Sequence, residues 1–300
     1  MPTDTLPPAL PPVLSFSYPR VLSIAGSDSG GGAGIQADLK TMSALGCYGM
    51  TAITALTAQN TQGVQGIYPV SAQFLKQQIQ SVAEDIGVDA VKIGMLHTPE
   101  IVEVVCWAID HFGWRHVVLD PVMVATSGDR LINEETVQVL VRDLFPRVSL
   151  ITPNLDEAEV LLGRKILGID ELDDAVAALL KLGAKSALLK GGHLPGERVV
   201  DVLATRDKLN LTDSDTDAGI QFQHLESLRI HSRNVHGTGC TLSSAIAAHL
   251  ARGDNLPTSV SLARGYILQA IEAGTRVSTG KPGGHGPLNH GFGPRPMMLI

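Results

Sequence analysis

Short apolar runs alternate with longer helix-like runs along most of this chain of 300 residues. The apolar runs, which are typical of buried strands, are residues 21–25, 90–94, 116–120, 148–152 and 186–190. The runs with apolar residues at helical spacing are residues 35–45, 72–86, 99–112, 133–144, 155–162 and 170–182. Because a helix between two strands returns the chain to the same end of the sheet, this alternation predicts βαβ crossovers and an α/β fold with a mostly parallel sheet.

Further elements are expected outside this alternation. A Thr- and Ile-rich run at residues 50–56 predicts a strand, and the polar residues 57–63 predict a connecting loop. Residues 198–205 and 221–230 are typical of extended segments around a polar turn. The acidic run in that turn, residues 213–217, departs from a calcium loop because its glycine comes late and no Glu follows at the last ligand position. We therefore expect a solvated hairpin tip there, and a final helix at residues 257–277.

The chain divides into three regions by composition. Residues 1–19 are rich in proline and are expected to be a disordered extension, without the charged and apolar regions of a signal peptide. Residues 20–293 carry the strand and helix pattern with no internal linker, and we expect them to form a single domain. Residues 294–300 are expected to be a C-terminal tail.

Composition excludes several classes of function. The net charge of −7 and the aromatic content of 4% argue against a nucleic-acid surface, which needs basic side chains and stacking rings. No apolar run is long enough to span a membrane, so no membrane partner is expected. Cys47, Cys106 and Cys240 are far apart and form no metal-ligand pattern, which is typical of a reducing cytoplasm.

Polar or glycine residues recur where the expected strands end. They are Gly26, Gln59, Gly94, Asp120, Asn154 and Gly191. In parallel sheets, ligands bind beyond the carboxyl ends of the strands. The repetition therefore predicts a ligand site at this edge, and it is stronger evidence than any one loop.

Two glycine-rich stretches could approach an anionic ligand. The first, residues 26–34, follows a strand but matches neither a phosphate-binding Walker loop nor a dinucleotide fingerprint. The second contains Gly237, Thr238 and Gly239 and runs into a helix, whose first turn offers unpaired N–H groups and a positive dipole end. Cys240 lies in that turn, where the pKa of a thiol is lowered. The alternative is a glycine-capped helix that carries a small buried cysteine.

Candidate phosphate and metal residues occur at the other strand ends. Asn154 and Glu157 are three residues apart at a helix start, so they share one face and could hold Mg²⁺ through water and bound phosphate. An ordinary helix cap is the alternative. Asp120 and Lys190 could approach phosphates, or could simply be a turn residue and a solvated lysine. His236 adjoins the glycine turn, with a structural hydrogen bond as its alternative.

Three residues could bind a planar ring. Gln59 has two donors and two acceptor lone pairs, which suit the edge of a nitrogen heterocycle. Met95 and Val122 follow strand ends and could form the walls of a ring pocket, although each could equally be a core residue.

Taken together, these motifs resemble the hydroxymethylpyrimidine/phosphomethylpyrimidine kinases of thiamine biosynthesis, in the ribokinase-like superfamily. The resemblance extends over residues 20–293. The motifs that carry it are residues 25–38, 54–61, 92–96, 119–123, 152–158, 190–193, 236–241 and 284–287. The resemblance implies a three-layer α/β/α fold and ATP-dependent phosphorylation of 4-amino-5-hydroxymethyl-2-methylpyrimidine and then of its monophosphate, with Mg²⁺.

The resemblance also implies a role for each candidate residue. Gly237, Thr238, Gly239 and Cys240 would form the catalytic anion hole, with Cys240 as the base. The pyrimidine would contact Gln59, Gly26, Ala33, Asp38, Met95 and Val122. Asp120, Asn154, Lys190 and His236 would bind the nucleotide phosphates, and Glu157 would hold the metal ion.

The resemblance leaves one departure and two alternative functions. Where the family usually has Asn-Thr-His before the glycines, this chain has Val235 in place of Thr. The alternative functions are a pyridoxal kinase of the same superfamily and a catalytically silent nucleotide-binding regulator. The family further implies a homodimer in the cytoplasm.

Overall fold

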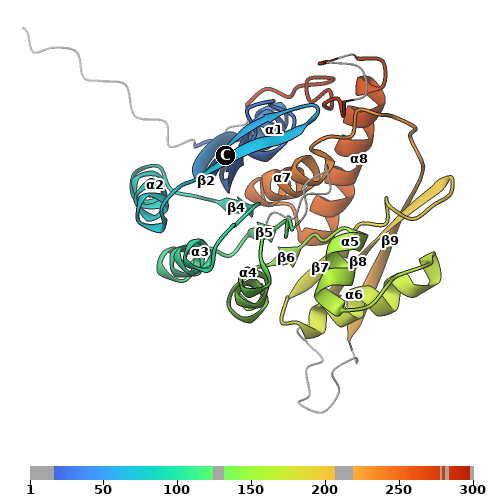
Figure 1. The fold of residues 1–300 in the computed structure, drawn as a ribbon, viewed down its shortest axis with the longest axis horizontal. Coiled ribbons are helices and arrows are strands. Elements are labelled where there is room, and N and C mark those ends of the chain that lie inside the picture. The colour runs from blue at the N-terminus through green and yellow to red at the C-terminus, as the bar shows by residue number, and fades with distance from the viewer. Residues whose placement is uncertain (1–16, 124–131, 207–218, 278, 281–283, 298–300) are drawn as a thin grey trace, which may run out of the picture.

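A computed structural model describes residues 17–123, 132–206, 219–277, 279–280 and 284–297. The expected extension up to residue 16, the acidic hairpin tip and the end of the tail lie outside the described residues. Within them, one nine-stranded sheet runs through the molecule in the order β3-β2-β1-β4-β5-β6-β7-β8-β9 (Figure 1). Its strands are β1 Arg20–Ser27, β2 Tyr48–Asn60, β3 Gly63–Pro69, β4 Ala90–Ile93, β5 Val117–Leu119, β6 Leu150–Ile151, β7 Ser186–Leu189, β8 Arg198–Arg206 and β9 Ile220–Leu228.

The sheet is parallel in its centre and antiparallel at its two edges. The pairs from β2 through β1, β4, β5 and β6 to β7 are parallel. The edge pairs β2–β3, β7–β8 and β8–β9 are antiparallel. The strand order reverses at β1 and β4, and ligands of such sheets bind at the carboxyl ends around this point.

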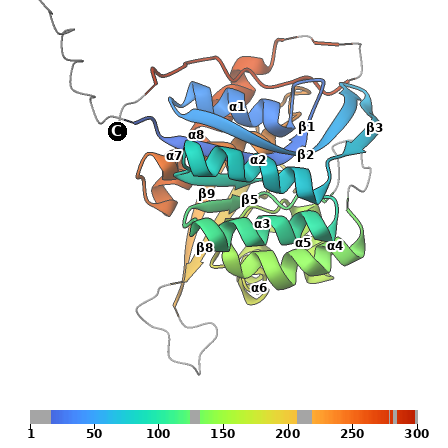
Figure 2. The ribbon, with the colours of Figure 1, turned by 90° about the vertical axis from the view of Figure 1, so that its left-hand side faces the viewer.

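Helices cover both faces of the sheet. They are α1 Gly34–Ala44, α2 Ala72–Asp85, α3 Pro99–Phe112, α4 Glu134–Val139, α5 Leu155–Leu162, α6 Leu172–Lys181, α7 Thr238–Ala251 and α8 Leu256–Gly274. Helices α1, α7 and α8 pack on one face, and α2 to α6 pack on the other, where α2 and α3 lie side by side (Figures 1 and 2). The expected three-layer α/β/α, ribokinase-like fold is confirmed.

Alternation along the central strands builds two cores from one sheet. In β1, Leu22 and Ile24 belong to the core beneath α2 and α3, whereas Val21 belongs to the core beneath α7. In β5, Val118 faces α7 while its neighbours face the other layer. Because side chains alternate along a strand, strands buried on both faces are apolar throughout, which explains the continuous apolar runs in the sequence.

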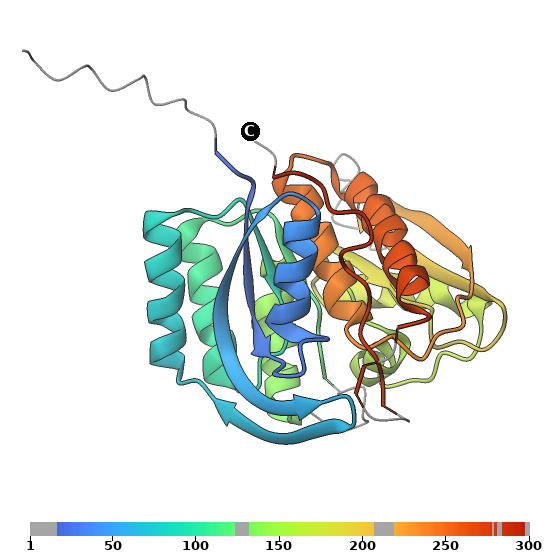
Figure 3. The same ribbon diagram turned by 90° about the horizontal axis from the view of Figure 1, so that it is seen from above.

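The β2–β3 hairpin differs from the expected loop at residues 57–63. Strand β2 continues to Asn60, and β3 pairs with it antiparallel (Figure 3). The hairpin is exposed on both faces, as shown by Ile67 at 46% and Tyr68 at 72% exposure. Strand β3 has no buried face and therefore no alternating apolar pattern, so the sequence carries no signal for it.

One expected helix covers its predicted residues but is irregular in its second half. The helix at residues 133–144 is α4 followed by a π-helical turn, Leu140–Leu144, in which the Phe145 N–H donates to the Leu140 carbonyl. Pro146 has no N–H to continue the helical pattern, and this explains the irregular ending. Among the described residues, no helix combines the length and hydropathy that a membrane crossing requires.

Candidate active site

A cavity of about 1060 Å³ opens at the carboxyl ends of the central strands. It is lined by all but one of the residues to which the family resemblance gave a role. Those lining it are Gly26, Ala33, Gln59, Met95, Asp120, Val122, Asn154, Glu157, Lys190, His236, Gly237, Thr238, Gly239 and Cys240. The fold therefore brings residues from seven separate motifs to one edge of the sheet, as the polar strand ends predicted.

The glycine turn begins helix α7 and faces the cavity. Gly237 has φ +87°, a conformation that favours glycine, and a Cβ atom there would collide with the carbonyl oxygen of Gly32. A Cβ atom on Gly239 would lie 3.2 Å from both Asp120 Oδ2 and Lys190 Nζ. The two glycines thus allow the first turn of α7 to approach the polar strand ends, leaving a space at its N–H groups that suits an anion.

Cys240 departs from the expected lowered pKa. Its side chain lines the cavity in a half-buried position on the first turn of α7. Burial raises the pKa of the Cys240 thiol to about 11, although Lys92 and a hydrogen bond from the Gly34 backbone act in the opposite direction. The expectation from the helix dipole alone was therefore wrong for the protein without ligands, because desolvation of the thiolate outweighs it.

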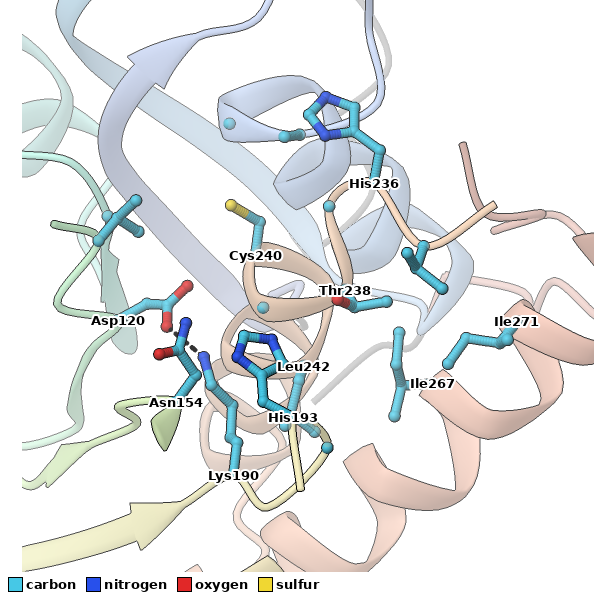
Figure 4. A pocket seen from close by; sticks show the side chains of 18 of the residues that line it. Asp120, Asn154, Lys190, His193, His236, Thr238, Cys240, Leu242, Ile267 and Ile271 are labelled. Atoms are coloured by element: carbon cyan, nitrogen blue, oxygen red, sulfur yellow. Dashed lines mark hydrogen bonds and ion pairs between the residues drawn. The ribbon is translucent and has the colours of Figure 1, made fainter. Parts of the chain in front are cut away.

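Asp120 and Lys190 form an ion pair in front of the glycine turn (Figure 4). Lys190 Nζ lies 2.9 Å from Asp120 Oδ1, and the Thr152 hydroxyl donates to the same oxygen at 3.1 Å. Burial by itself lowers the pKa of Lys190, but the charges of Asp120 and Glu157 raise it above its ordinary value. Lys190 is therefore a fixed cation at the place where phosphate would meet the helix terminus.

Asn154 and Glu157 form a reciprocal cap at the start of α5. The Glu157 N–H donates to Asn154 Oδ1 at 2.9 Å, and the Asn154 N–H donates to Glu157 Oε2 at 2.8 Å. Both residues also line the cavity, so the helix cap and the phosphate or metal role are compatible. Burial raises the pKa of Glu157 to about 7, and Asp120 adds to this while Lys190 opposes it.

The chemistry of this end of the cavity fits Mg²⁺ bound through phosphate. Within the described ranges, no group of three His, Cys, Asp or Glu side chains is arranged to hold a metal ion by itself. Mg²⁺ usually keeps several waters and takes only one or two carboxylates together with substrate phosphates. Glu157, with Asp120 nearby, can supply such a carboxylate.

The opposite end of the cavity is organised around Asp28. Its carboxylate accepts hydrogen bonds from the N–H groups of Gly30, Gly32 and Ala33 at 2.8–3.0 Å, which fixes the first glycine-rich loop. His236 Nε2 lies 2.9 Å from Asp28 Oδ2. Burial alone would raise the pKa of Asp28, but the contacts with His236 and the loop N–H groups lower it below its ordinary value.

His236 therefore lies on the Gln59 side of the glycine turn. The Gln59 amide nitrogen is 3.4 Å from His236 Nε2. The ring contacts the loop at Gly32, where a Cβ atom would collide with it. The structure places His236 between the two glycine-rich segments, and its predicted phosphate contact stays a prediction.

Asp38 is the candidate that the structure does not bring to the cavity. Its side chain is fully buried, and its two oxygens accept hydrogen bonds from Lys92, Ser23 and Ser244. With both oxygens occupied, Asp38 is not arranged to contact a ring in the cavity. Lys92 was not among the predicted site residues, although a single charged residue within the buried strand β4 is a usable signal.

A third part of the cavity wall is apolar. Leu242 on α7 lies opposite Ile267 and Ile271 on α8 (Figure 4), and Val235 and Leu268 also line the cavity. Val235 had no assigned place from the sequence. The structure places it in the cavity lining, whereas no spacing rule in the sequence pointed to α8.

The fold and this cavity define a class of protein. A three-layer α/β/α sheet, with a glycine turn and helix terminus facing a lysine–aspartate pair, is the arrangement of a ribokinase-like phosphotransferase. The model of the phosphomethylpyrimidine kinase family matches residues 28–289, and the chain belongs to this family.

Individual relatives agree with this assignment. The chain is 47% identical over 270 residues to hydroxymethylpyrimidine/phosphomethylpyrimidine kinase of Rhizobium meliloti. The matched residues are 90% of this chain and 96% of that protein. The crystal structure of phosphomethylpyrimidine kinase from Clostridium difficile matches with a TM-score of 0.70 and 42% identity, over 84% of this chain and 99% of that one. An ADP complex of Bacillus subtilis pyridoxal kinase matches with a TM-score of 0.79 and 36% identity, over 91% and 98%. The family, the fold and the kinase function expected from the motifs are confirmed.

Proposed function

We propose that the protein transfers the γ-phosphoryl group of ATP to hydroxymethylpyrimidine and then to the resulting monophosphate, yielding the diphosphate used in thiamine biosynthesis. The observation that carries this proposal is that one cavity extends from Gln59, which could bind a ring, to Gly239 and Lys190, which could bind an anion. Membership of the family supports the choice of substrate.

The pyrimidine is proposed to bind at the Gln59 end. The Gln59 amide can donate to a ring nitrogen and accept from the adjacent exocyclic amino group, because it carries both functions. Met95 and Val122 line the cavity as apolar surfaces for the ring, and Gly26 and Ala33 leave room beside it. A Cβ atom on Gly26 would lie 2.9 Å from the Met95 methyl carbon, so this part of the wall is closely packed.

ATP is proposed to lie with its base at the apolar end and its phosphates at the helix terminus. Val235, Leu242 and Ile267 offer an apolar surface for the base. Lys190 and the N–H groups of Gly239 and Cys240 would stabilise charge on the phosphoryl oxygens during transfer. Glu157 and Asn154 would hold Mg²⁺, which neutralises phosphate charge when it is bound.

Cys240 is proposed as the base that accepts the proton of the substrate hydroxyl. It lies in the first turn of α7, next to the N–H groups that would face the phosphoryl group. The raised pKa of its thiol means that the thiolate is a minor form at neutral pH in the free protein. We therefore expect kcat/KM to increase with pH across the neutral range, as the thiolate fraction increases.

A panel of acceptors tests the proposed function. With ATP and Mg²⁺, hydroxymethylpyrimidine and pyridoxal are supplied separately, and the products are identified by mass. We expect kcat/KM to be higher for hydroxymethylpyrimidine. Pyridoxal phosphorylation is the second candidate, since a pyridoxal kinase shares this fold at 36% identity, and a preference for pyridoxal would contradict the proposal. Nucleotide binding without turnover of either acceptor would favour a silent regulator.

We further propose a homodimer in the cytoplasm. The apolar side chains Leu56, Ile67 and Tyr68 are exposed on the β2–β3 hairpin, and a second copy could cover them. The three cysteines are free, as is usual in a reducing compartment. Light scattering tests the dimer, for which a mass of one chain, 31.7 kDa, would be the contrary result.

A further inference from the structure

A fully buried ion pair lies beneath the cavity, between strand β4 and helix α1. Lys92 Nζ is 2.9 Å from both carboxylate oxygens of Asp38, and neither side chain is accessible to solvent. Lys92 nevertheless forms part of the cavity lining. A Cβ atom on Gly94 would lie 3.0 Å from Lys92 Nζ, so the ammonium group lies close under the end of β4.

Hydrogen bonds connect this pair to the helix that carries Cys240. The Ser244 hydroxyl donates to Asp38 Oδ1 at 2.7 Å, and the Ser23 hydroxyl donates to Asp38 Oδ2 at 2.6 Å. Ser244 is four residues after Cys240 on α7, so the two residues share a face of that helix. The position of the Lys92 charge is thereby fixed relative to the first turn of α7.

Stability alone does not account for this pair. Removing two charges from water is costly, and replacing a buried ion pair by well-packed apolar residues is often neutral or stabilising. The surrounding strand residues Val91 and Ile93 are apolar and fully buried, so an apolar residue at position 92 would continue the pattern of β4. A buried pair that packing does not require is more readily explained by an effect on the cavity above it.

We propose that Lys92, held in place by Asp38, is a positioning residue that stabilises the thiolate of Cys240. The thiolate then accepts the proton of the substrate hydroxyl and later returns it to water. This inference rests on the proposed role of Cys240 as the base. It assigns no contact between Lys92 and the substrate.

Charged groups on several elements act on Cys240. Lys92 on β4 lowers the pKa of the thiol, and Asp38 on α1 raises it to a smaller degree. Asp120, which follows β5, also raises the pKa of the thiol. Lys190, which follows β7, and the Cys240 thiolate attract each other, so each favours the charged form of the other. Asp120 and Lys190 are paired with each other, so their influences partly cancel. The net favourable charge on this side of Cys240 therefore comes from Lys92.

The test replaces both members of the pair, because removing one alone would leave an uncompensated buried charge. In Lys92→Met/Asp38→Asn, we expect the pKa of Cys240 to increase by about one unit. At pH 8 this shift leaves about tenfold less thiolate, but a more basic thiolate is also a better nucleophile. Alkylation by iodoacetamide should therefore become about threefold slower. The rate is followed at the Cys240 peptide by mass spectrometry, with the buried Cys47 and Cys106 as internal references.

A matched control removes another ion pair. Arg20 and Asp89 pair at 2.6 Å at the start of β1, at the opposite end of the sheet from the cavity. Arg20→Met/Asp89→Asn should leave the alkylation rate of Cys240 unchanged. If the Met/Asn variant does not fold, Lys92→Gln/Asp38→Asn retains a polar pair and tests the same charge removal.

The outcomes separate this inference from the proposed function. Slower alkylation of Cys240, together with an alkaline shift in the pH profile of kcat/KM, supports the inference. An unchanged alkylation rate in a folded variant overturns it, even where activity is lost, because the pair would then be merely structural. The alkylation rate does not depend on turnover. Activity that survives Cys240→Ala would contradict the proposed role of Cys240 as the base, but it would leave the result of the alkylation experiment unchanged.

Discussion

At the residue scale, Cys240 is subject to opposing influences. Burial raises the pKa of its thiol to about 11, whereas Lys92 and the Gly34 N–H favour the thiolate. The sequence correctly indicated a thiol in the first turn of a helix, but it could not show how strongly the surrounding fold excludes water. Desolvation depends on residues far apart in the chain, and no local pattern reports it.

Replacing Cys240 with alanine tests its role directly. We expect kcat to decrease by about 10²- to 10⁴-fold, which is the usual contribution of a general base. ATP binding, measured by calorimetry, should be retained, because the N–H groups of the helix terminus are unaffected by the side chain. Unchanged turnover would show that another group accepts the proton.

A second residue-scale prediction concerns His290 and acid stability. Burial lowers the pKa of His290 to about 4, and its Nε2 atom lies 2.9 Å from the Thr241 hydroxyl. In the unfolded chain this histidine becomes protonated near pH 6.5, whereas in the folded protein it becomes protonated only near pH 4. The folded state therefore loses stability as pH falls through this window, by about 3 kcal/mol at most.

His290→Gln should lose less of its unfolding free energy than the unmodified protein between pH 6.5 and pH 4. Glutamine cannot bind the proton, but it can retain a hydrogen bond to Thr241. Urea denaturation at a series of pH values measures the difference. Parallel pH dependences for the two proteins would rule out this contribution.

At the scale of elements, the β1–α1 and β9–α7 connections meet at the glycine turns. Helix α7 begins immediately after Gly237, and the carbonyl of Gly32 occupies the space that a side chain at Gly237 would need. The close approach of the two glycine-rich segments positions Asp28 against His236. We therefore expect Gly237 to matter for the geometry of the cavity more than for the stability of the helix.

Gly237→Ala and Gly253→Ala form a matched pair at the two ends of α7. Both glycines have positive φ, but a Cβ atom on Gly253 would meet nothing within 4 Å. Each substitution should cost about 1 kcal/mol of stability from backbone strain, and the collision with the Gly32 carbonyl should add to the cost at Gly237. Only Gly237→Ala should also reduce kcat/KM, by about 100-fold, because it displaces the catalytic turn. Equal kinetic effects in the two variants would contradict this account.

The elements differ in how well the sequence predicted them. Helix α3 was predicted with its observed bounds from Pro99 at its start, and the structure adds a Thr98 cap and Gly113 in the left-handed conformation at its end. The strand at residues 50–56 was predicted within β2, but the end of β2 and the whole of β3 were missed, because neither face is buried there. Asp38 was marked by its motif, but its burial beneath the cavity depends on the tertiary pairing with Lys92.

At the scale of the whole molecule, the sheet topology explains why separated motifs form one site. Parallel strands end at the same edge, so Gly26, Asp120 and Lys190 meet there although they are distant in sequence. The sequence predicted this edge from the recurrence of polar strand ends. It did not predict the apolar lining from α8, since a helix after the last strand has no fixed place relative to the sheet.

The same cavity is proposed to accept both the free pyrimidine and its monophosphate. The second acceptor is anionic, so its phosphate needs positive potential near the reacting group. Lys190 and the N-terminus of α7 can supply it on the side of the cavity where the phosphoryl group would be transferred.

Turnover with the monophosphate as the only acceptor tests this central claim most directly. The protein is incubated with ATP, Mg²⁺ and phosphomethylpyrimidine, and the product is identified by mass while ADP release is measured. We predict formation of the diphosphate with one ADP released per product, and its loss in Cys240→Ala. Absence of diphosphate, under conditions in which the free pyrimidine is phosphorylated, would contradict the claim that one site performs both steps.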